Sequence, residues 1–154
     1  MSPTPGLREA VACSCFAVRR AARAITQHYD RHLKPAGLRA TQFTALTVLS
    51  LAGPLPLSQL AEQLGTERTT LTRSLRLLKA RGWVRELPTD DRRVRMLEVT
   101  GRGAAAAHAA LPYWRRAQKS IADHLGPAAT RALHLAAEAA TGTSAATALR
   151  TTGR

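Results

Sequence analysis

The apolar residues of the N-terminal third recur at helical spacing. Their spacing by fours and threes is typical of a helix that packs along another helix, and the stripe consists of Val11, Cys15, Val18, Ala22, Ile25, Tyr29 and Leu33. We expect this helix to cover about 7–34 and to end before Pro35. Such a helix is longer than one small domain needs, so part of the stripe is expected to face another subunit. A second segment, about 41–52, is apolar on most sides and predicts a buried helix.

Two short helices around a glycine are predicted next. Ser58 is a good N-cap for a helix that stops at Gly65, and Thr66 is expected to cap a second helix over 67–81. One face of the second helix is apolar at positions i, i+4 and i+7, which predicts that this face docks on a core. These positions are Leu71, Leu75 and Leu78.

The opposite face of the 67–81 helix carries threonines and arginines, where a solvated helix would mix in acidic residues. Short hydroxyls and long guanidiniums suit the major groove of DNA, where they reach phosphates and base edges together. We expect Arg68 and Arg76 to contact phosphates. The residues expected to read bases are Thr69, Thr70 and Arg73.

A β-hairpin is predicted directly after Gly82. The chain reads WVRELP, TDDRR and VRMLEVT, so two β-prone runs flank a segment with turn chemistry. The tip is expected at 90–93 with Arg92 and Arg93 projecting from it, and a narrow, negative minor groove is a natural target for arginine. The alternative, a helical hairpin with a charged surface loop, is less favoured because helix, glycine and arginine-tipped hairpin follow with almost no spacer.

The hairpin run also carries a family pattern. Asp91, Arg93, Leu97, Val99 and Thr100 match the pattern D-x-R-x-x-x-L-x-L-T without a gap. On these residues the segment resembles the winged helix-turn-helix of the MarR family of bacterial regulators, and the resemblance extends over nearly the whole chain. It implies that Arg93 enters the minor groove, that Asp91 orients it, and that Arg73 lies close to both.

The resemblance implies a mainly α-helical fold with a two- to three-stranded β wing. Within a single domain over 1–154, it assigns 41–100 to a winged helix-turn-helix lobe that binds DNA, and 7–34 and 102–148 to dimerisation helices. It implies a homodimer that binds double-stranded DNA at an inverted repeat, usually as a repressor. Release of the DNA would follow when a small molecule or an oxidant binds.

The C-terminal part is predicted to form a long helix and a shorter one. The long helix starts at about Arg102, Gly126 with Pro127 breaks it, and the last helix runs to about Thr141 or somewhat beyond. The segment 104–148 holds 18 alanines, which are small enough for helices to approach closely in a dimer bundle. Helix propensity is an equally good explanation of that composition.

The net charge of the chain restricts the kinds of partner that it is expected to bind. The 154 residues carry 23 Lys and Arg against 10 Asp and Glu, a formal net charge of +13, which favours a polyanionic partner. The excess lies on the predicted DNA-reading segment and not on an amphipathic membrane helix, since 66–102 holds ten basic and five acidic residues. The charge by itself would also allow a non-specific architectural DNA-binding protein, which is the alternative function.

Several other classes are not expected. The sequence shows no secretory leader and no apolar run of about 18 residues, so we expect a soluble, cytoplasmic protein with no membrane partner. It shows no Walker loop, dinucleotide fingerprint, H-E-x-x-H motif or four-ligand zinc spacing. We therefore expect no enzyme activity, no cofactor and no metal site.

Two cysteines near the N-terminus are candidates for receiving a signal. Cys13 and Cys15 lie about 200° apart around the expected helix, so they cannot pair without unwinding it. Cys15 followed by Phe16 is similar to the Cys-Phe of the organic-peroxide-sensing branch of the MarR family, which makes Cys15 a redox-sensing candidate for hydroperoxide. The alternative is that Cys15 is a small core residue. A zinc site with His28 and His32 is disfavoured because three helical turns separate the groups.

A small aromatic acid is the other candidate effector. The resemblance implies a pocket between the dimerisation helices and the DNA lobe. Carried onto this chain, it places Arg23 as the anion partner of an acid, beside the lining residues His28, Tyr29, Phe43, Tyr113 and Trp114. The alternative is that these aromatic side chains belong to the core.

Overall fold

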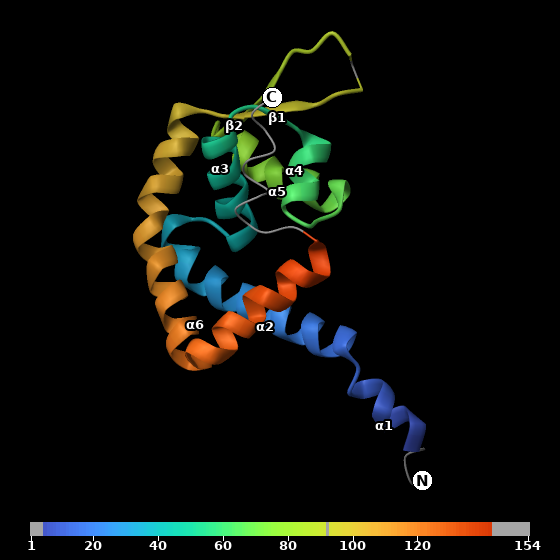
Figure 1. The fold of residues 1–154 in the computed structure, drawn as a ribbon. Helices are drawn as coiled ribbons and strands as arrows, with labels where there is room; N and C mark the ends of the chain where they lie inside the picture. Colours follow the sequence, from blue (N-terminus) through green and yellow to red (C-terminus); the bar gives the residue numbers. More distant parts are fainter. Residues whose placement is uncertain (1–4, 92, 143–154) are drawn as a thin grey trace.

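The computed structural model describes residues 5–91 and 93–142. Figure 1 shows a lobe of short helices with a projecting hairpin, and longer helices that extend away from the lobe. The elements follow in the order α1 (Pro5–Val11), α2 (Ser14–Leu33), the 3₁₀ helix η1 (Lys34–Ala36), α3 (Ala40–Ala52), β1 (Leu55–Pro56), α4 (Leu57–Gln63), α5 (Arg68–Ala80), β2 (Val84–Leu87), β3 (Met96–Val99) and α6 (Gly101–Thr141). The predicted fold class, mainly helical with a small β wing, is confirmed.

The N-terminal helix is interrupted, where the sequence predicts one continuous helix over 7–34. α1 and α2 are separate because Cys13 is extended, with φ −68° and ψ 149°. The Cys13 sulfur accepts a hydrogen bond from the backbone N–H of Phe16 at 3.4 Å and so caps α2. The geometry expected for Cys13 and Cys15, two positions on one uninterrupted helix, is therefore wrong.

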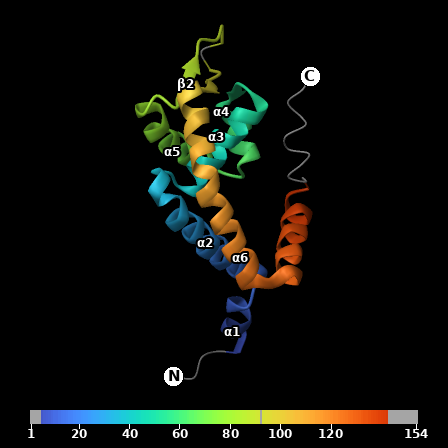
Figure 2. The ribbon, with the colours of Figure 1, turned by 90° about the vertical axis from the view of Figure 1, so that its left-hand side faces the viewer.

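The apolar stripe of the N-terminal helices is covered at one end. Leu33 is fully buried, and Ile25 and Tyr29 are half-buried. Figure 2 shows α1 extending away from the lobe. The part of the stripe nearest the N-terminus is exposed in this chain, namely Val11, Cys15, Val18 and Ala22.

α4 and α5 form the predicted helix pair, but both helices have other N-caps than expected. Pro56 precedes α4, because β1 runs directly into it, and so Ser58 lies inside the helix. Glu67 precedes α5, and Thr66 belongs to the turn after α4, where its N–H donates to the carbonyl of Ala61 at 3.0 Å. The interpretation of Ser58 and Thr66 as N-caps is therefore wrong, by two residues for α4 and by one residue for α5.

The core of the lobe lies between the helices and the sheet. The sheet is antiparallel with strand order β1-β3-β2, and α3 is buried on most sides, as its sequence predicts. Leu33 of α2 and both Ala107 and Ala110 of α6 belong to the same hydrophobic cluster. The long helices therefore complete the core of the lobe. Its largest fully buried side chains are Leu33, Leu46, Leu49, Leu60, Leu71, Leu75, Leu78, Leu97 and Val84.

α6 is divided into two arms by a bend. Gly126 has φ 77° and ψ 165° inside the helix and Pro127 follows it, which confirms the break predicted at this pair. Figures 1 and 2 show the second arm reversing direction at the bend and diverging from the first. The last part of the segment 102–148, from residue 143 on, lies outside the described residues.

The first turn of α6 packs tightly against the base of the hairpin. Thr100 caps the helix, since its hydroxyl accepts from Gly103 N at 3.1 Å and donates to the Gly82 carbonyl at 2.7 Å. Gly103 is buried, and a Cβ built there would overlap the carbonyl oxygen of Trp83 and lie 2.9 Å from Val99 Cγ2. A glycine is therefore required at position 103 by the backbone of a neighbouring element.

We expect Gly103→Ala to lower the free energy of unfolding by about 1–3 kcal/mol, because the added methyl group must displace the backbone at Trp83. Gly101→Ala is the matched control, since position 101 is exposed and a Cβ there meets no atom within 4 Å. Its stability should stay within about 0.5 kcal/mol of wild type. Urea unfolding followed by circular dichroism measures both, and equal stabilities would contradict the packing described.

Candidate nucleic-acid interface

α5 presents one face to the core and the other to solvent. Leu71, Leu75 and Leu78 are buried as predicted. The ion pairs formed by the described residues involve none of the arginines on the outer face. Their guanidiniums therefore form no ion pair within the described chain. The exposed residues of this face are Arg68, Thr69, Thr70, Arg73 and Arg76.

The tip of the hairpin is organised by a carboxylate. Asp91 Oδ1 accepts a hydrogen bond from the backbone N–H of Arg93 at 2.9 Å, and the Asp91 carbonyl accepts from Val94 N at 2.9 Å. Thr89 Oγ1 donates to the same carbonyl at 2.8 Å. Side-chain bonds of this kind replace regular pairing in turns, so Asp91 fixes the backbone from which the exposed Arg93 side chain leaves.

Of the expected grouping of Asp91, Arg93 and Arg73, the structure shows the contact between Asp91 and Arg93. The hydrogen bonds and ion pairs of the described residues join Asp91 to Arg93 and do not extend to Arg73. Arg92 lies outside the described residues. In both ribbon views the hairpin projects from the lobe on the side away from the bend of α6 (Figures 1 and 2). The exposed Arg93 belongs to the segment between β2 and β3 of this hairpin.

Charged side chains at the base of the hairpin form pairs that the sequence analysis missed. Glu86 Oε1 accepts from Lys79 Nζ of α5 and from Arg95 Nη2, the latter at 2.5 Å. Arg85 and Glu98 pair at 2.7 Å across the strands. Burial, and then the charge of Arg95, lower the pKa of Lys79. These contacts depend on the register of β2 and β3, which no local motif specifies.

A cavity of about 240 Å³ lies between α2, α3 and α6. Three of the six expected effector residues line it, namely Tyr29, Phe43 and Trp114. The rings of Phe43 and Trp114 stack with centroids 6.2 Å apart. The Tyr29 hydroxyl donates to Gln118 Oε1, and burial raises the pKa of Tyr29.

The other three expected effector residues are not among those that line this cavity. Arg23 is exposed, and the guanidinium of Arg116 covers the Tyr113 ring at 4.8 Å from its centroid. His28 lines a second cavity of about 460 Å³, together with Arg31 and His124 among others, and Ile25 lines both cavities. The cationic partner expected for an acid therefore does not reach the aromatic cavity.

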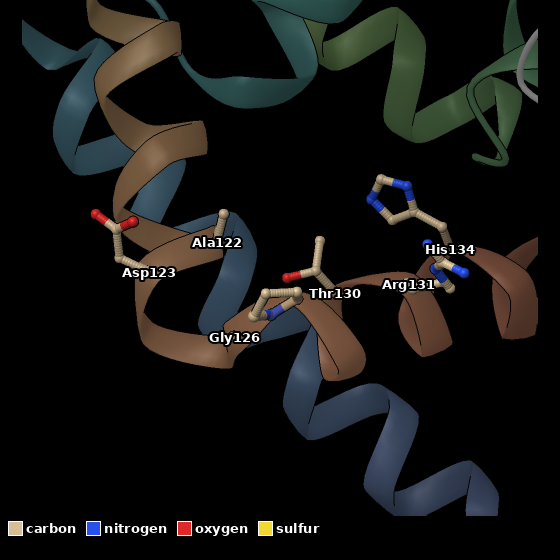
Figure 3. A pocket seen from close by; sticks show the side chains of 7 residues that line it. Ala122, Asp123, Gly126, Thr130, Arg131 and His134 are labelled. Carbon is tan, nitrogen blue, oxygen red and sulfur yellow. The ribbon is translucent and has the colours of Figure 1, made fainter.

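A third cavity, of about 620 Å³, opens at the bend of α6 (Figure 3). Asp123 of the first arm and both Arg131 and His134 of the second line it, and Figure 3 shows these polar side chains on either side of the bend. The Thr130 hydroxyl is buried and has no hydrogen-bond partner among the described residues. The sequence predicted the break in the helix but not this hollow.

Cys13 and Cys15 are both exposed and both free. Cys15 is therefore not a core residue of the single chain, which contradicts the alternative interpretation of its role. In the part of the chain that the structure describes, no cluster of three or more histidine, cysteine or acidic side chains could hold a metal ion. None of the described helices is long and apolar enough to cross a membrane.

Comparison with known proteins gives concordant matches. Residues 36–93 match the model of the MarR family. YwoH of Bacillus subtilis, described as an uncharacterized HTH-type transcriptional regulator, is 29% identical over 83 residues, which are 54% of this chain and 61% of that protein. The multiple antibiotic resistance protein MarR of Salmonella typhimurium is 34% identical over 86 residues, 53% of this chain and 60% of that protein. The matches thus span about three fifths of these curated relatives.

A solved structure matches over a longer range. The transcriptional regulator MosR of M. tuberculosis, in its crystal structure with DNA, is 41% identical and superposes with a TM-score of 0.71. The match covers 84% of this chain and 97% of that chain.

The buried position of Tyr29 can be tested by titration. Tyr29 and Tyr113 are the two tyrosines of the chain, so Tyr113→Phe leaves Tyr29 as the source of the tyrosinate absorbance. We expect its midpoint to lie above pH 10.0, and Tyr29→Phe to lose this transition.

The same shift predicts how stability depends on pH. The folded state holds the phenolic proton of Tyr29 more tightly than the unfolded chain. Its contribution to stability is therefore fully present below about pH 10 and is lost as the pH rises through the raised pKa. A midpoint at the ordinary value in Tyr113→Phe would contradict the burial of Tyr29.

Proposed function

Because this chain belongs to the MarR family of winged helix transcriptional regulators, we propose that it represses transcription in the cytoplasm as a homodimer that binds an inverted repeat in double-stranded DNA. The observation that carries the proposal is the exposed threonine and arginine face of α5, beside a hairpin whose tip is organised by Asp91. The formal net charge of +13 adds attraction to DNA of any sequence.

In the proposed complex α5 lies in the major groove. Arg68 and Arg76 contact phosphates, which set position without reading sequence. Guanidinium and hydroxyl groups closer to the base edges supply the preference for particular bases. The residues in this second role are Thr69, Thr70 and Arg73.

The hairpin is proposed to follow the backbone into the flanking minor groove. Arg93 is the side chain inserted there, and its neighbour in sequence, Arg92, is assigned to the same groove. The bond from Arg93 N to Asp91 Oδ1 restrains the backbone at Arg93 before binding, and such restraint lowers the entropy lost when DNA is bound. A narrow minor groove at A·T base pairs attracts arginine most strongly.

We propose that a second copy of the chain packs against exposed apolar side chains on the N-terminal helices and on the second arm of α6. Exposed apolar patches mark interfaces in proteins of this size. Two-fold pairing places two α5 helices about one DNA turn apart, roughly 10 base pairs, and makes the target an inverted repeat. The exposed side chains are Leu7, Val11, Phe16 and Val18 at the N-terminal end, and Leu133 and Leu135 on the second arm of α6.

A similar protein of known structure supports the proposal that this chain binds DNA. MosR was solved with DNA, and its match with this chain covers 97% of it at 41% identity. An architectural protein that coats DNA is the rival function, because the net charge would suit it. Such a protein gives a steep salt dependence without a discrete footprint.

The assigned contacts predict that variants in the hairpin and in α5 change DNA binding in different ways. Full-length protein is used to select duplexes from a randomised pool, and affinities are measured at one salt concentration. Arg93→Ala should weaken binding about tenfold and reduce the penalty for replacing flanking A·T pairs with G·C. Thr70→Ala and Arg73→Ala should instead change the preferred bases inside each half-site. A selection without any enriched inverted repeat would favour the architectural rival.

A small aromatic molecule is proposed as one signal for release. The cavity beside Tyr29, Phe43 and Trp114 is formed by α2, α3 and α6, so a bound ring would lie between the lobe and the long helices. Its volume of about 240 Å³ suits a single ring. Since Arg23 does not line it, hydroxyl groups such as those of Tyr29 and Thr26 would provide the polar contacts.

An organic hydroperoxide is the second proposed signal, received by Cys15. The exposed sulfur is accessible to such a molecule. In this reaction the sulfur attacks the O–O bond, the thiol becomes a sulfenic acid, and the hydroperoxide leaves as an alcohol.

The redox signal is tested with cumene hydroperoxide and a selected duplex. We expect wild type to lose affinity by about fivefold or more and Cys15→Ser to keep it. Cys13→Ser is the matched control, because it removes the neighbouring exposed thiol, and it should respond as wild type does. Equal responses in wild type and Cys15→Ser would overturn the role of Cys15.

A further inference from the structure

One carboxylate joins the recognition helix α5 to the hairpin. Glu86 lies on β2, and its Oε1 accepts hydrogen bonds from Lys79 near the end of α5 and from Arg95 just before β3. The two Arg95 contacts measure 2.5 Å from Nη2 and 3.2 Å from Nε. We call these three side chains the Glu86 cluster. It connects the recognition helix with both sides of the hairpin base.

The Glu86 cluster also reaches the first helix of the pair. The backbone carbonyl of Arg95 accepts from the N–H of Leu57, the first residue of α4, at 2.8 Å. Arg95 therefore contacts α4 through its backbone and β2 through its side chain. The base of the hairpin is therefore connected to α4 and to α5, the helix that carries the proposed major-groove surface.

We infer that Glu86 is a positioning residue that fixes the direction of the hairpin relative to α5, so that contacts in the major groove and in the flanking minor groove form together. This inference rests on the proposed DNA binding. Glu86 touches no DNA in this arrangement. Its effect on binding passes through the orientation of the hairpin that carries Arg93.

The physical case rests on geometry rather than on the strength of one ion pair. Single exposed ion pairs contribute little stability, and the Glu86 cluster is part-exposed, with 29% of the Lys79 side chain and 39% of Glu86 accessible. Two cations share one oxygen here: Arg95 holds the Glu86 carboxylate within the hairpin, and Lys79 joins that carboxylate to α5. Separating the hairpin from α5 therefore breaks the Lys79 contact with a carboxylate whose position Arg95 fixes. Burial of Lys79, which lowers its pKa, agrees with a packed junction.

The hairpin contains its own control. Arg85 and Glu98 stand directly opposite each other in the register of β2 and β3 and pair at 2.7 Å. This pair lies wholly within the hairpin, and among the described residues it forms no hydrogen bond or ion pair with α5. Glu86→Gln and Glu98→Gln each remove one negative charge near the proposed interface, so both should raise the general attraction to DNA to a similar degree.

The experiment compares wild type, Glu86→Gln and Glu98→Gln as full-length proteins. Each is titrated with a duplex selected by wild type from a randomised pool, and with a version whose flanking A·T pairs are replaced by G·C. We expect the flank replacement to cost wild type and Glu98→Gln about tenfold in affinity and Glu86→Gln less than about threefold. Glu86→Asp, which keeps the carboxylate, should recover part of the flank dependence.

Folding is monitored by urea unfolding and by hydrogen exchange of the hairpin amides. Unchanged exchange together with a lost flank penalty in Glu86→Gln supports positioning, since the hairpin is then intact but no longer directed. Equal flank penalties in Glu86→Gln and Glu98→Gln, with binding retained, overturn the role of Glu86 and leave the proposed function standing. Failure of wild type to enrich any duplex overturns the proposed function and this inference with it.

Discussion

The close approach of the α6 backbone to Trp83 is the constraint on which the arrangement of this molecule depends. Gly103 lets the first turn of α6 lie against the carbonyl of Trp83, and Thr100 closes the junction with bonds to Gly82 and Gly103. The direction of α6 is then set relative to the sheet, which brings Ala107 into the hydrophobic core. The long helix and the hairpin are thus parts of one packed unit.

The joint between the long helices and the lobe is polar as well as apolar. Asp30 of α2 accepts from the N–H of Ala40 at 2.7 Å, at the start of α3. His28 contacts the Ala117 carbonyl of α6 at 3.2 Å, and Tyr29 bonds Gln118 one residue further on. Three successive residues of α2 therefore connect to two different elements. The aromatic cavity lies at this joint, where α2 and α3 are connected by a hydrogen bond as well as by packing.

Local patterns predicted the features that depend on neighbouring residues. The buried leucines of α5 follow from helical spacing, the hairpin from its turn chemistry, and the bend at Gly126 from glycine followed by proline. The break at Cys13 was missed because neither glycine nor proline marks it, and its cap is a sulfur acceptor. The Glu86 cluster was missed because it joins α5, β2 and the residue before β3, which meet through tertiary structure. Local sequence predicts the periodicity of an element, but it does not predict the distances between elements.

The bend at Gly126 also has a consequence for solubility. It directs the second arm of α6 away from the first, and that arm exposes Leu133 and Leu135 to water. An uncovered apolar arm favours association of any kind, ordered or not. With the proposed pairing disabled, the chain would lose the surface that shields these leucines and would precipitate at concentrations that the paired protein tolerates. In the proposed dimer, covering these leucines would therefore also protect the protein against precipitation.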